Sequence, residues 1–181
     1  MTNGESSYRR FLEGDNESFR VIVDDYYDML VLYINTYVKN PDVAENLAED
    51  TFVKLVTKKP KFKGKSSFKT WLYSIARNTA LDYLKSLSKA QYSQIEEITD
   101  ISSDELIEDA FLIEERKIII NKALKSLKLE YRQAIWLKYF EDMSAKEIAV
   151  VMKKSQNSVE HLLSRARESL REILKEEDID L

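Results

Sequence analysis

The chain contains very few residues that interrupt regular secondary structure. Its 181 residues include only three glycines and two prolines, at Gly4, Gly14, Gly64, Pro41 and Pro60. An all-β fold needs frequent turns, and glycine and proline are the strongest turn signals in a sequence. Because these signals are so sparse, we expect an all-α fold of long helices with short connections.

Three apolar stripes in the first half of the chain predict three helices. Each stripe has the spacing of three and four residues that places apolar side chains along one side of a helix. Pro41 suits the first turn of the second helix, and Pro60 stops that helix. The predicted helices span about residues 19–37, 41–59 and 67–86, and they form one helical module.

A change of composition separates this module from a second one. Residues 88–105 lose the apolar stripe and carry five carboxylates against one lysine, which is typical of a linker. The sequence from Ser102 to Glu105 has the form of a capping box, so a helix is expected to restart there. Further helices are predicted at about residues 130–140, 144–152 and 156–174. We therefore expect two small domains, residues 1–87 and 113–181, joined by an acidic linker at 88–112.

The composition disfavours several classes of function. There is no cysteine and only one histidine, so a disulfide framework, a Cys/His zinc site and a Ser-His-Asp centre are all disfavoured. No glycine-rich phosphate loop or nucleophile motif is present, and we expect no enzyme activity, no cofactor and no metal. No stretch has the signal-peptide pattern or approaches the ~20 apolar residues of a membrane helix. The expectation is a soluble cytoplasmic protein without membrane insertion.

Positive charge is concentrated in one part of this acidic chain. The formal net charge is −4, yet the stretch "KKPKFKGKSSFKTW" at residues 58–71 holds six lysines, two phenylalanines and a tryptophan. Lysines neutralise phosphates, and exposed aromatic rings stack on unpaired bases, so this mixture favours binding to single-stranded nucleic acid. The alternative is that the lysines solvate a loop while the aromatic rings fill the core; Trp71 is assigned mainly to packing.

The second module has the layout of a helix-turn-helix. A short helix capped at Ser144 is followed by a polar turn and by a longer helix that carries His161, Arg165 and Arg167. A helical hairpin that binds no DNA would share this layout. Two candidate nucleic-acid modules in one chain favour the DNA-binding interpretation.

These stretches resemble an extracytoplasmic-function (group 4) sigma factor of bacterial RNA polymerase, in the sigma-70 family. "DVAENLAEDTFVKLVTKKPKFKGKSSFKTWLYSIARNTALDYLK" at 42–85 resembles sigma region 2, and residues 124–171, with "SAKEIA" and "SRAR", resemble region 4. The resemblance implies a subunit that binds core RNA polymerase and promoter DNA, directs promoter-specific transcription initiation and is restrained by an anti-sigma factor. The alternative is a free-standing helix-turn-helix regulator.

The resemblance also implies three functional surfaces. Docking on core polymerase would use Asp42, Glu45, Leu47, Glu49, Asp50 and Phe52. Recognition of the minus-ten element, duplex and unpaired strand, would use Lys61, Phe62, Lys63, Lys65, Ser67, Lys69, Ile75 and Asn78. Recognition of the minus-thirty-five element would use Lys153, Lys154, Ser155, Asn157, Ser158, Glu160, His161, Ser164, Arg165 and Arg167. In the minus-ten set, Phe62 would line the base pocket, and Asn78 would offer a donor and an acceptor to a base edge.

The second module departs from the family pattern at three positions. The family usually has a glycine where Lys153 stands, a basic residue where Glu160 stands and often an arginine where Leu162 stands. Fewer basic groups on this helix predict weaker binding of the isolated module to DNA. Arg165 and Arg167 match the family and are the expected phosphate contacts, and Glu160 is a candidate for reading a base.

Overall fold

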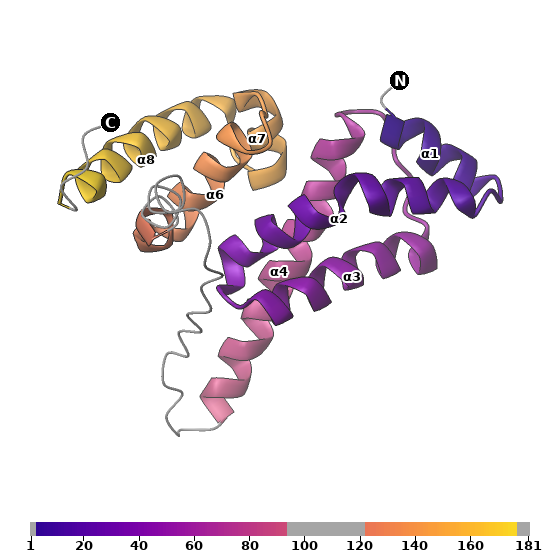
Figure 1. Cartoon of the computed structure of the whole chain (residues 1–181), viewed down its shortest axis with the longest axis horizontal. Helices are drawn as coiled ribbons and strands as arrows, with labels where there is room; N and C mark the ends of the chain where they lie inside the picture. The colour runs from indigo at the N-terminus through magenta and orange to yellow at the C-terminus, as the bar shows by residue number, and fades with distance from the viewer. Residues whose placement is uncertain (1–2, 94–121, 177–181) are drawn as a thin grey trace, which may run out of the picture.

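The computed structural model describes residues 3–93 and 122–176, and every regular element in these two ranges is a helix (Figure 1). The N-terminal module contains α1 (Asn3–Leu12), α2 (Glu17–Val38), α3 (Pro41–Lys58) and α4 (Phe68–Ser93). The C-terminal module contains a helical turn at residues 122–126 and then α6 (Leu129–Tyr139), α7 (Ala145–Met152) and α8 (Gln156–Glu176). The all-α expectation is confirmed.

Helix α1 was missing from the sequence prediction, which placed the first helix of this domain at about residues 19–37. Only a few of its residues are apolar, but two of them, Tyr8 and Phe11, are buried against the rest of the module. Gly4 is also buried, and a Cβ atom there would lie 2.5 Å from Cδ1 of Phe68 and 2.8 Å from the hydroxyl of Tyr26. Helix α1 therefore packs at its glycine directly onto α4 and α2.

The next helices begin where the sequence predicts them. Pro41 occupies the first turn of α3, and the side chain of Asn40 accepts a hydrogen bond from the backbone N–H of Val43 at 3.1 Å. Helix α4 was expected to end near Ser86 but continues to Ser93. Residues 85–89 are exposed, so burial does not stabilise this end of the helix. Local helix propensity sustains it, because no glycine or proline stops the helix there.

The C-terminal module follows the predicted pattern closely. Ser144 and Glu147 form the capping box at the start of α7, with both reciprocal hydrogen bonds present. Lys153 ends α7 in the left-handed conformation, with φ of 55°. The predicted helix restart at Ser102 lies outside the described residues.

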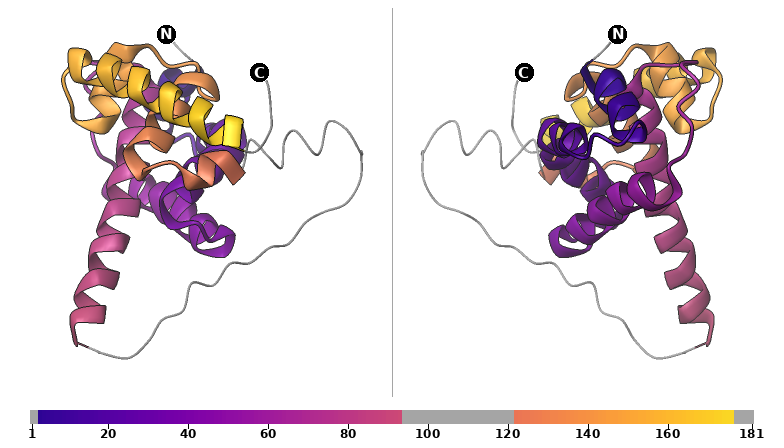
Figure 2. Two further views of the ribbon diagram at one scale, coloured as in Figure 1. Left: turned by 90° about the vertical axis from the view of Figure 1, so that its left-hand side faces the viewer. Right: turned by 90° about the vertical axis from the view of Figure 1, so that its right-hand side faces the viewer.

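The two modules pack against each other. Helix α7 lies on α4 and helix α6 lies on α2, as two views at right angles show (Figure 1, Figure 2). Buried apolar residues of both modules, among them Tyr73 of α4 and Ile148 of α7, belong to one continuous hydrophobic cluster. Burial of this shared surface stabilises one relative arrangement of the modules.

Candidate nucleic-acid and polymerase interfaces

The basic loop between α3 and α4 is anchored to α1. The hydroxyl of Tyr8 donates a hydrogen bond of 2.8 Å to the backbone carbonyl of Pro60. Burial raises the pKa of Tyr8 to about 12, so the hydroxyl stays protonated as the donor at neutral pH. Lys59 Nζ lies 5.3 Å from the centroid of the Phe11 ring, and Gly64 turns the backbone with φ of 65°. The loop is thus held at a defined place on the module.

An aromatic cluster lies under this loop. The Phe62 ring meets Phe68 edge-on at a centroid distance of 5.8 Å and lies 5.3 Å from Trp71. Phe68 is buried, whereas Phe62 and Trp71 are partly exposed. The packing role expected for Trp71 is confirmed, since its ring also lies 5.4 Å from Phe68 and 5.3 Å from Tyr8. Phe62 therefore combines a fixed position with an accessible ring.

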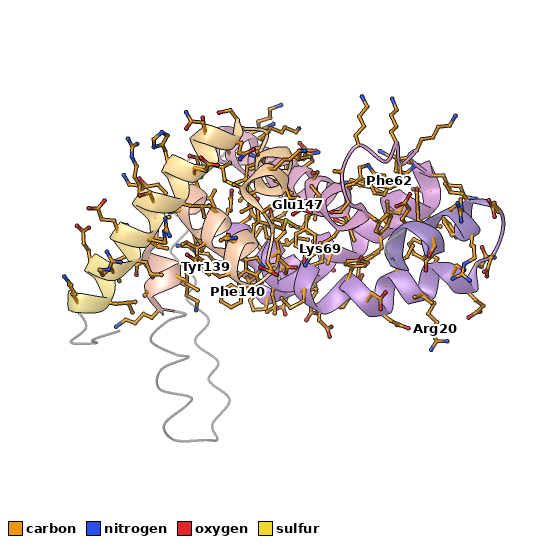
Figure 3. The ribbon with its side chains drawn as sticks, turned by 90° about the horizontal axis from the view of Figure 1, so that it is seen from above. Arg20, Phe62, Lys69, Tyr139, Phe140 and Glu147 are labelled. Carbon is orange, nitrogen blue, oxygen red and sulfur yellow. The ribbon has the colours of Figure 1, made fainter. Side chains whose placement is uncertain are left out.

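The loop that carries this ring also carries three exposed lysines. Lys61, Lys63 and Lys65 are exposed, and Figure 3 shows long side chains with nitrogen tips projecting from the loop beside Phe62. None of them is needed to fill the core. An accessible aromatic ring on a loop of exposed lysines is a combination suited to bind an unpaired base together with its phosphates.

Three of the predicted minus-ten residues, Ser67, Lys69 and Asn78, make hydrogen bonds to the C-terminal module. Asn78 Oδ1 accepts a hydrogen bond of 3.0 Å from Nζ of Lys153, a residue predicted to contact the minus-thirty-five element. Ser67 Oγ and Thr70 Oγ1 each donate to Glu147 Oε1 at 3.2 Å. These hydrogen bonds contribute to a lowered pKa of Glu147, whose largest cause is the backbone N–H of Ser144. The packing of the modules brings together residues assigned to two different promoter elements.

A carboxylate of the C-terminal module is buried in the same contact. Glu141 Oε2 lies 2.8 Å from Lys69 Nζ, and its side chain is 2% exposed against 35% for Lys69. Lys69 Nζ also donates to the backbone carbonyl of Glu141 at 2.8 Å. Burial, with the charge of Glu141 as a further cause, raises the pKa of the Tyr73 hydroxyl. Figure 3 shows Lys69 and Glu147 in the contact region between the two modules. Sequence reasoning missed Glu141, because no motif marks it.

The acidic surface of α3 differs from the prediction in its apolar part. Asp42, Glu45, Glu49 and Asp50 are exposed as expected. Leu47 and Phe52 are each only 6% exposed, because they lie on the side of α3 that packs on α2. The centroid of the Phe52 ring lies 6.2 Å from that of the Tyr27 ring on α2.

The accessible apolar groups beside these carboxylates are Val53, 54% exposed, and Val56, 40% exposed. Leu47 and Phe52 are thus corrected to core residues. Val53 and Val56 take their place in the exposed surface. They follow Glu49 by four and seven residues, a helical spacing that places them on the same side of α3 as Glu49 and could have identified them from the sequence.

Several predicted minus-thirty-five residues have structural partners within the C-terminal module. Ser155 Oγ accepts from the backbone N–H of Ser158 at 3.1 Å, which caps α8. Lys154 Nζ forms an ion pair of 3.0 Å with Glu130. The accessible remainder of the set is on α8: Asn157, Glu160, His161, Ser164, Arg165 and Arg167. Gln156 donates to Glu160 Oε1 at 2.9 Å, which fixes the glutamate on the exposed side of the helix.

No group of three or more His, Cys, Asp or Glu side chains that could hold a metal occurs in the part of the chain that the structure describes. Among those same residues, no helix is both long and apolar enough to cross a membrane.

Comparison with known proteins identifies both modules. Residues 22–90 match the family model of sigma-70 region 2, and residues 117–170 match that of sigma-70 region 4. The chain belongs to the sigma-70 family. The ECF RNA polymerase sigma-E factor of Salmonella typhimurium is 29% identical over 170 residues, which cover 89% of this chain and 88% of that protein.

Two solved structures share the fold of this sigma factor. One is the sigma factor RpoE in complex with the anti-sigma factor NepR from Bartonella quintana, with a TM-score of 0.72, 24% identity and coverage of 88% of this chain and 98% of that one. The other is CnrH in complex with the cytosolic domain of CnrY, with a TM-score of 0.70, 20% identity and coverage of 96% of this chain and 98% of that one.

This sigma factor is of the extracytoplasmic-function type. It binds core RNA polymerase and promoter DNA and directs transcription initiation, and it is not an enzyme. The prediction from the sequence is confirmed, and the alternative of a free-standing regulator is not supported, because regions 2 and 4 occur in one chain in the order of the family.

Proposed function

We propose that the loop at residues 59–67 captures an unpaired base of the minus-ten element. The observation that carries this proposal is the partly exposed Phe62 ring, which packs on Phe68 and Trp71 and lies on a loop with exposed lysines. A base stacked on this ring would leave the adjoining phosphates close to Lys61 and Lys63. Asn78 on α4 would then hydrogen-bond the base edge, once its side chain is free of Lys153.

We propose that α8 contacts the minus-thirty-five element. Arg165 and Arg167 are exposed on α8 and would neutralise phosphates of the duplex. Glu160 cannot bind a phosphate, but it can accept a hydrogen bond from the exocyclic amine of cytosine in the major groove. The arginines would then supply affinity, and Glu160 would supply base preference.

We propose that the exposed side of α3 docks on core RNA polymerase. The four carboxylates Asp42, Glu45, Glu49 and Asp50 lie beside the exposed side chains of Val53 and Val56. An acidic helix surface with an apolar patch suits a basic amphipathic helix as its partner, since opposite charge steers association and apolar burial stabilises it.

We also propose that an anti-sigma factor restrains this protein in the cytoplasm by binding a groove that both modules line. The cavity between α2 and α6 has a volume of about 380 Å³, with Leu32, Trp136 and Phe140 in its walls. Lys39, Lys125 and Arg132 also line it, and no carboxylate does. Within the described residues, Asn35 Oδ1, Arg132 Nε and Trp136 Nε1 are buried without a hydrogen-bond partner. An acidic amphipathic helix would complement this groove.

One experiment tests the promoter assignments together. The protein is reconstituted with core RNA polymerase, and transcription start sites on genomic DNA are determined by sequencing. A shared upstream and minus-ten sequence among the mapped promoters supports the proposal. The promoters used by the Glu160→Ala variant are then aligned in the same way, to show whether one upstream position loses its base preference. Initiation that is independent of the added protein would contradict it.

A further inference from the structure

We propose that Tyr8 of α1 is a positioning residue for minus-ten recognition, although it touches no DNA itself. Its hydroxyl holds the backbone of the loop at Pro60, and its ring contacts the two aromatic residues on which Phe62 packs. Helix α1 thereby becomes part of the recognition machinery. The inference rests on the proposed function in one respect, namely that Phe62 stacks on an unpaired base.

The first argument is that α1 holds the start of the loop. Residues 59–67 belong to no helix, so contacts with neighbouring elements fix the course of their backbone. Pro60 lies two residues before Phe62, and its carbonyl accepts the hydrogen bond of 2.8 Å from Tyr8. Lys59 Nζ lies 5.3 Å from the centroid of the Phe11 ring, which also belongs to α1. Two consecutive residues are thus held by α1 immediately before the segment that carries the exposed ring.

The second argument concerns the ring of Tyr8. Its centroid lies 5.6 Å from that of Phe68 and 5.3 Å from that of Trp71. The Phe62 ring packs on the same two rings, at 5.8 and 5.3 Å. Tyr8 is 1% exposed, which leaves no surface for a contact with DNA. One buried side chain therefore fixes both the backbone next to Phe62 and the rings on which Phe62 packs.

The third argument is that the close approach of α1 depends on a glycine. A Cβ atom at Gly4 would lie 2.5 Å from Cδ1 of Phe68, so a larger residue there would displace either α1 or the Phe68 ring. The missing side chain lets α1 lie against α4 at the depth that brings the Tyr8 hydroxyl to Pro60.

Preorganisation connects this buried contact with DNA binding. A loop that already has its bound conformation loses less entropy when the base enters. Where only a fraction of the molecules holds that conformation, the apparent affinity is reduced to the same fraction of its intrinsic value. One net hydrogen bond changes such an equilibrium by about three- to tenfold. Loss of the Tyr8 hydroxyl should weaken binding of the unpaired strand on this scale.

The test is Tyr8→Phe, which removes the hydroxyl and keeps the ring. Holoenzyme is titrated with a fluorescent single strand that carries the minus-ten sequence mapped for it, and with strands in which one base at a time is replaced by an abasic site. Tyr8→Phe should bind the intact strand about three- to tenfold more weakly than the unmodified protein. This loss should disappear on the strand that lacks the captured base, because the loop then has no base to hold.

Two further variants separate positioning from a general loss of stability. Tyr37→Phe is the matched control, because it removes another buried tyrosine hydroxyl of the same module, which lies 2.7 Å from the hydroxyl of Tyr33 and not at the loop. It should leave strand binding unchanged. Combining Tyr8→Phe with Phe62→Leu should weaken binding no more than Phe62→Leu alone, since Tyr8 acts through Phe62. Urea unfolding and co-elution with core polymerase show that each variant is folded and docked.

The outcomes distinguish the two levels of the inference. Tyr8→Phe that binds the intact strand as tightly as the unmodified protein, or that loses the same factor on every abasic strand, overturns the role of Tyr8 and leaves base capture standing. An equal loss in Tyr37→Phe also overturns it, because the effect then follows stability. Binding by the unmodified protein that no abasic site weakens overturns base capture by the loop, and the role of Tyr8 falls with it.

Discussion

Replacement of Phe62 by leucine separates the two roles that the structure gives this side chain. Phe62 packs on Phe68 and Trp71, and it also presents part of its ring to solvent. Leucine keeps an apolar group of similar size over the cluster but removes the aromatic face. The packing role and the stacking role therefore predict different outcomes for this one substitution.

The magnitudes follow from the geometry. Phe62→Leu is a hydrophobic exchange at a partly exposed position, so the free energy of unfolding should fall by less than about 1.5 kcal/mol. Stacking of a base on an aromatic ring contributes about 1 to 3 kcal/mol, so loss of the ring should reduce promoter opening roughly fivefold to more than a hundredfold. Phe62→Ala should reduce opening equally and cost additional stability, because it also empties the space above Phe68 and Trp71.

The assay is permanganate footprinting of melted thymines by the holoenzyme at a promoter mapped for this protein. Urea unfolding of the same variants measures their stability, and co-elution with core polymerase shows that docking is intact. Tyr139→Leu is the matched control, since Tyr139 is 56% exposed on the other module and should not affect melting. Promoter opening by Phe62→Leu at the level of the unmodified protein would refute stacking and leave the ring with packing alone.

Further predictions concern the other surfaces. Charge reversal of Glu45 and Glu49, both exposed on α3, should weaken co-elution with core polymerase and leave the circular dichroism spectrum unchanged; undiminished co-elution rejects this surface. Glu160→Ala should relax the preference at one upstream base pair at a cost of about 1 to 3 kcal/mol on the preferred sequence, measured over a randomised element. Arg165→Ala should weaken all upstream sequences alike and lower the slope of log affinity against log salt by about one unit. The pKa of Glu147 is lowered from 4.5 in the folded protein, so its stabilising contribution is present above that value and is lost as the pH falls through the folded pKa; Glu147→Gln should flatten the acid side of the unfolding curve.

The sequence predicted those parts of the fold that depend on local signals. Pro41 and the capping box from Ser144 to Glu147 mark helix starts through contacts between near neighbours, and both were located correctly. Helix α1 was missed because its stability comes from packing: Gly4 and Tyr8 both contact Phe68 of α4, which lies 60 or more positions away. Such a contact leaves no periodic pattern within ten residues.

The sequence predicted which segments form the candidate sites, but it did not predict which of their residues are exposed or which contact the other module. Leu47 and Phe52 were assigned to the docking surface through the family resemblance, although the helical period places both on the apolar stripe, and the structure buries them in the core. Glu141 could not have been found, because a buried carboxylate in a loop becomes meaningful only when Lys69 of the other module lies 2.8 Å from it. The arrangement of the modules is a tertiary property, and no local signal encodes it.

Lys153 has a strained backbone conformation, and its side chain contacts the other module. A lysine with φ of 55° costs the turn about 1 kcal/mol or more relative to glycine, which adopts this conformation freely. The side chain of the same residue reaches Asn78 on the other module, and glycine at this position could not make that hydrogen bond. A screen that selects for thermal tolerance of the isolated C-terminal module would therefore enrich Lys153→Gly, while the full chain carrying it would lose one of its restraints. Lys153 thus exchanges a relaxed turn for a hydrogen bond between the two modules.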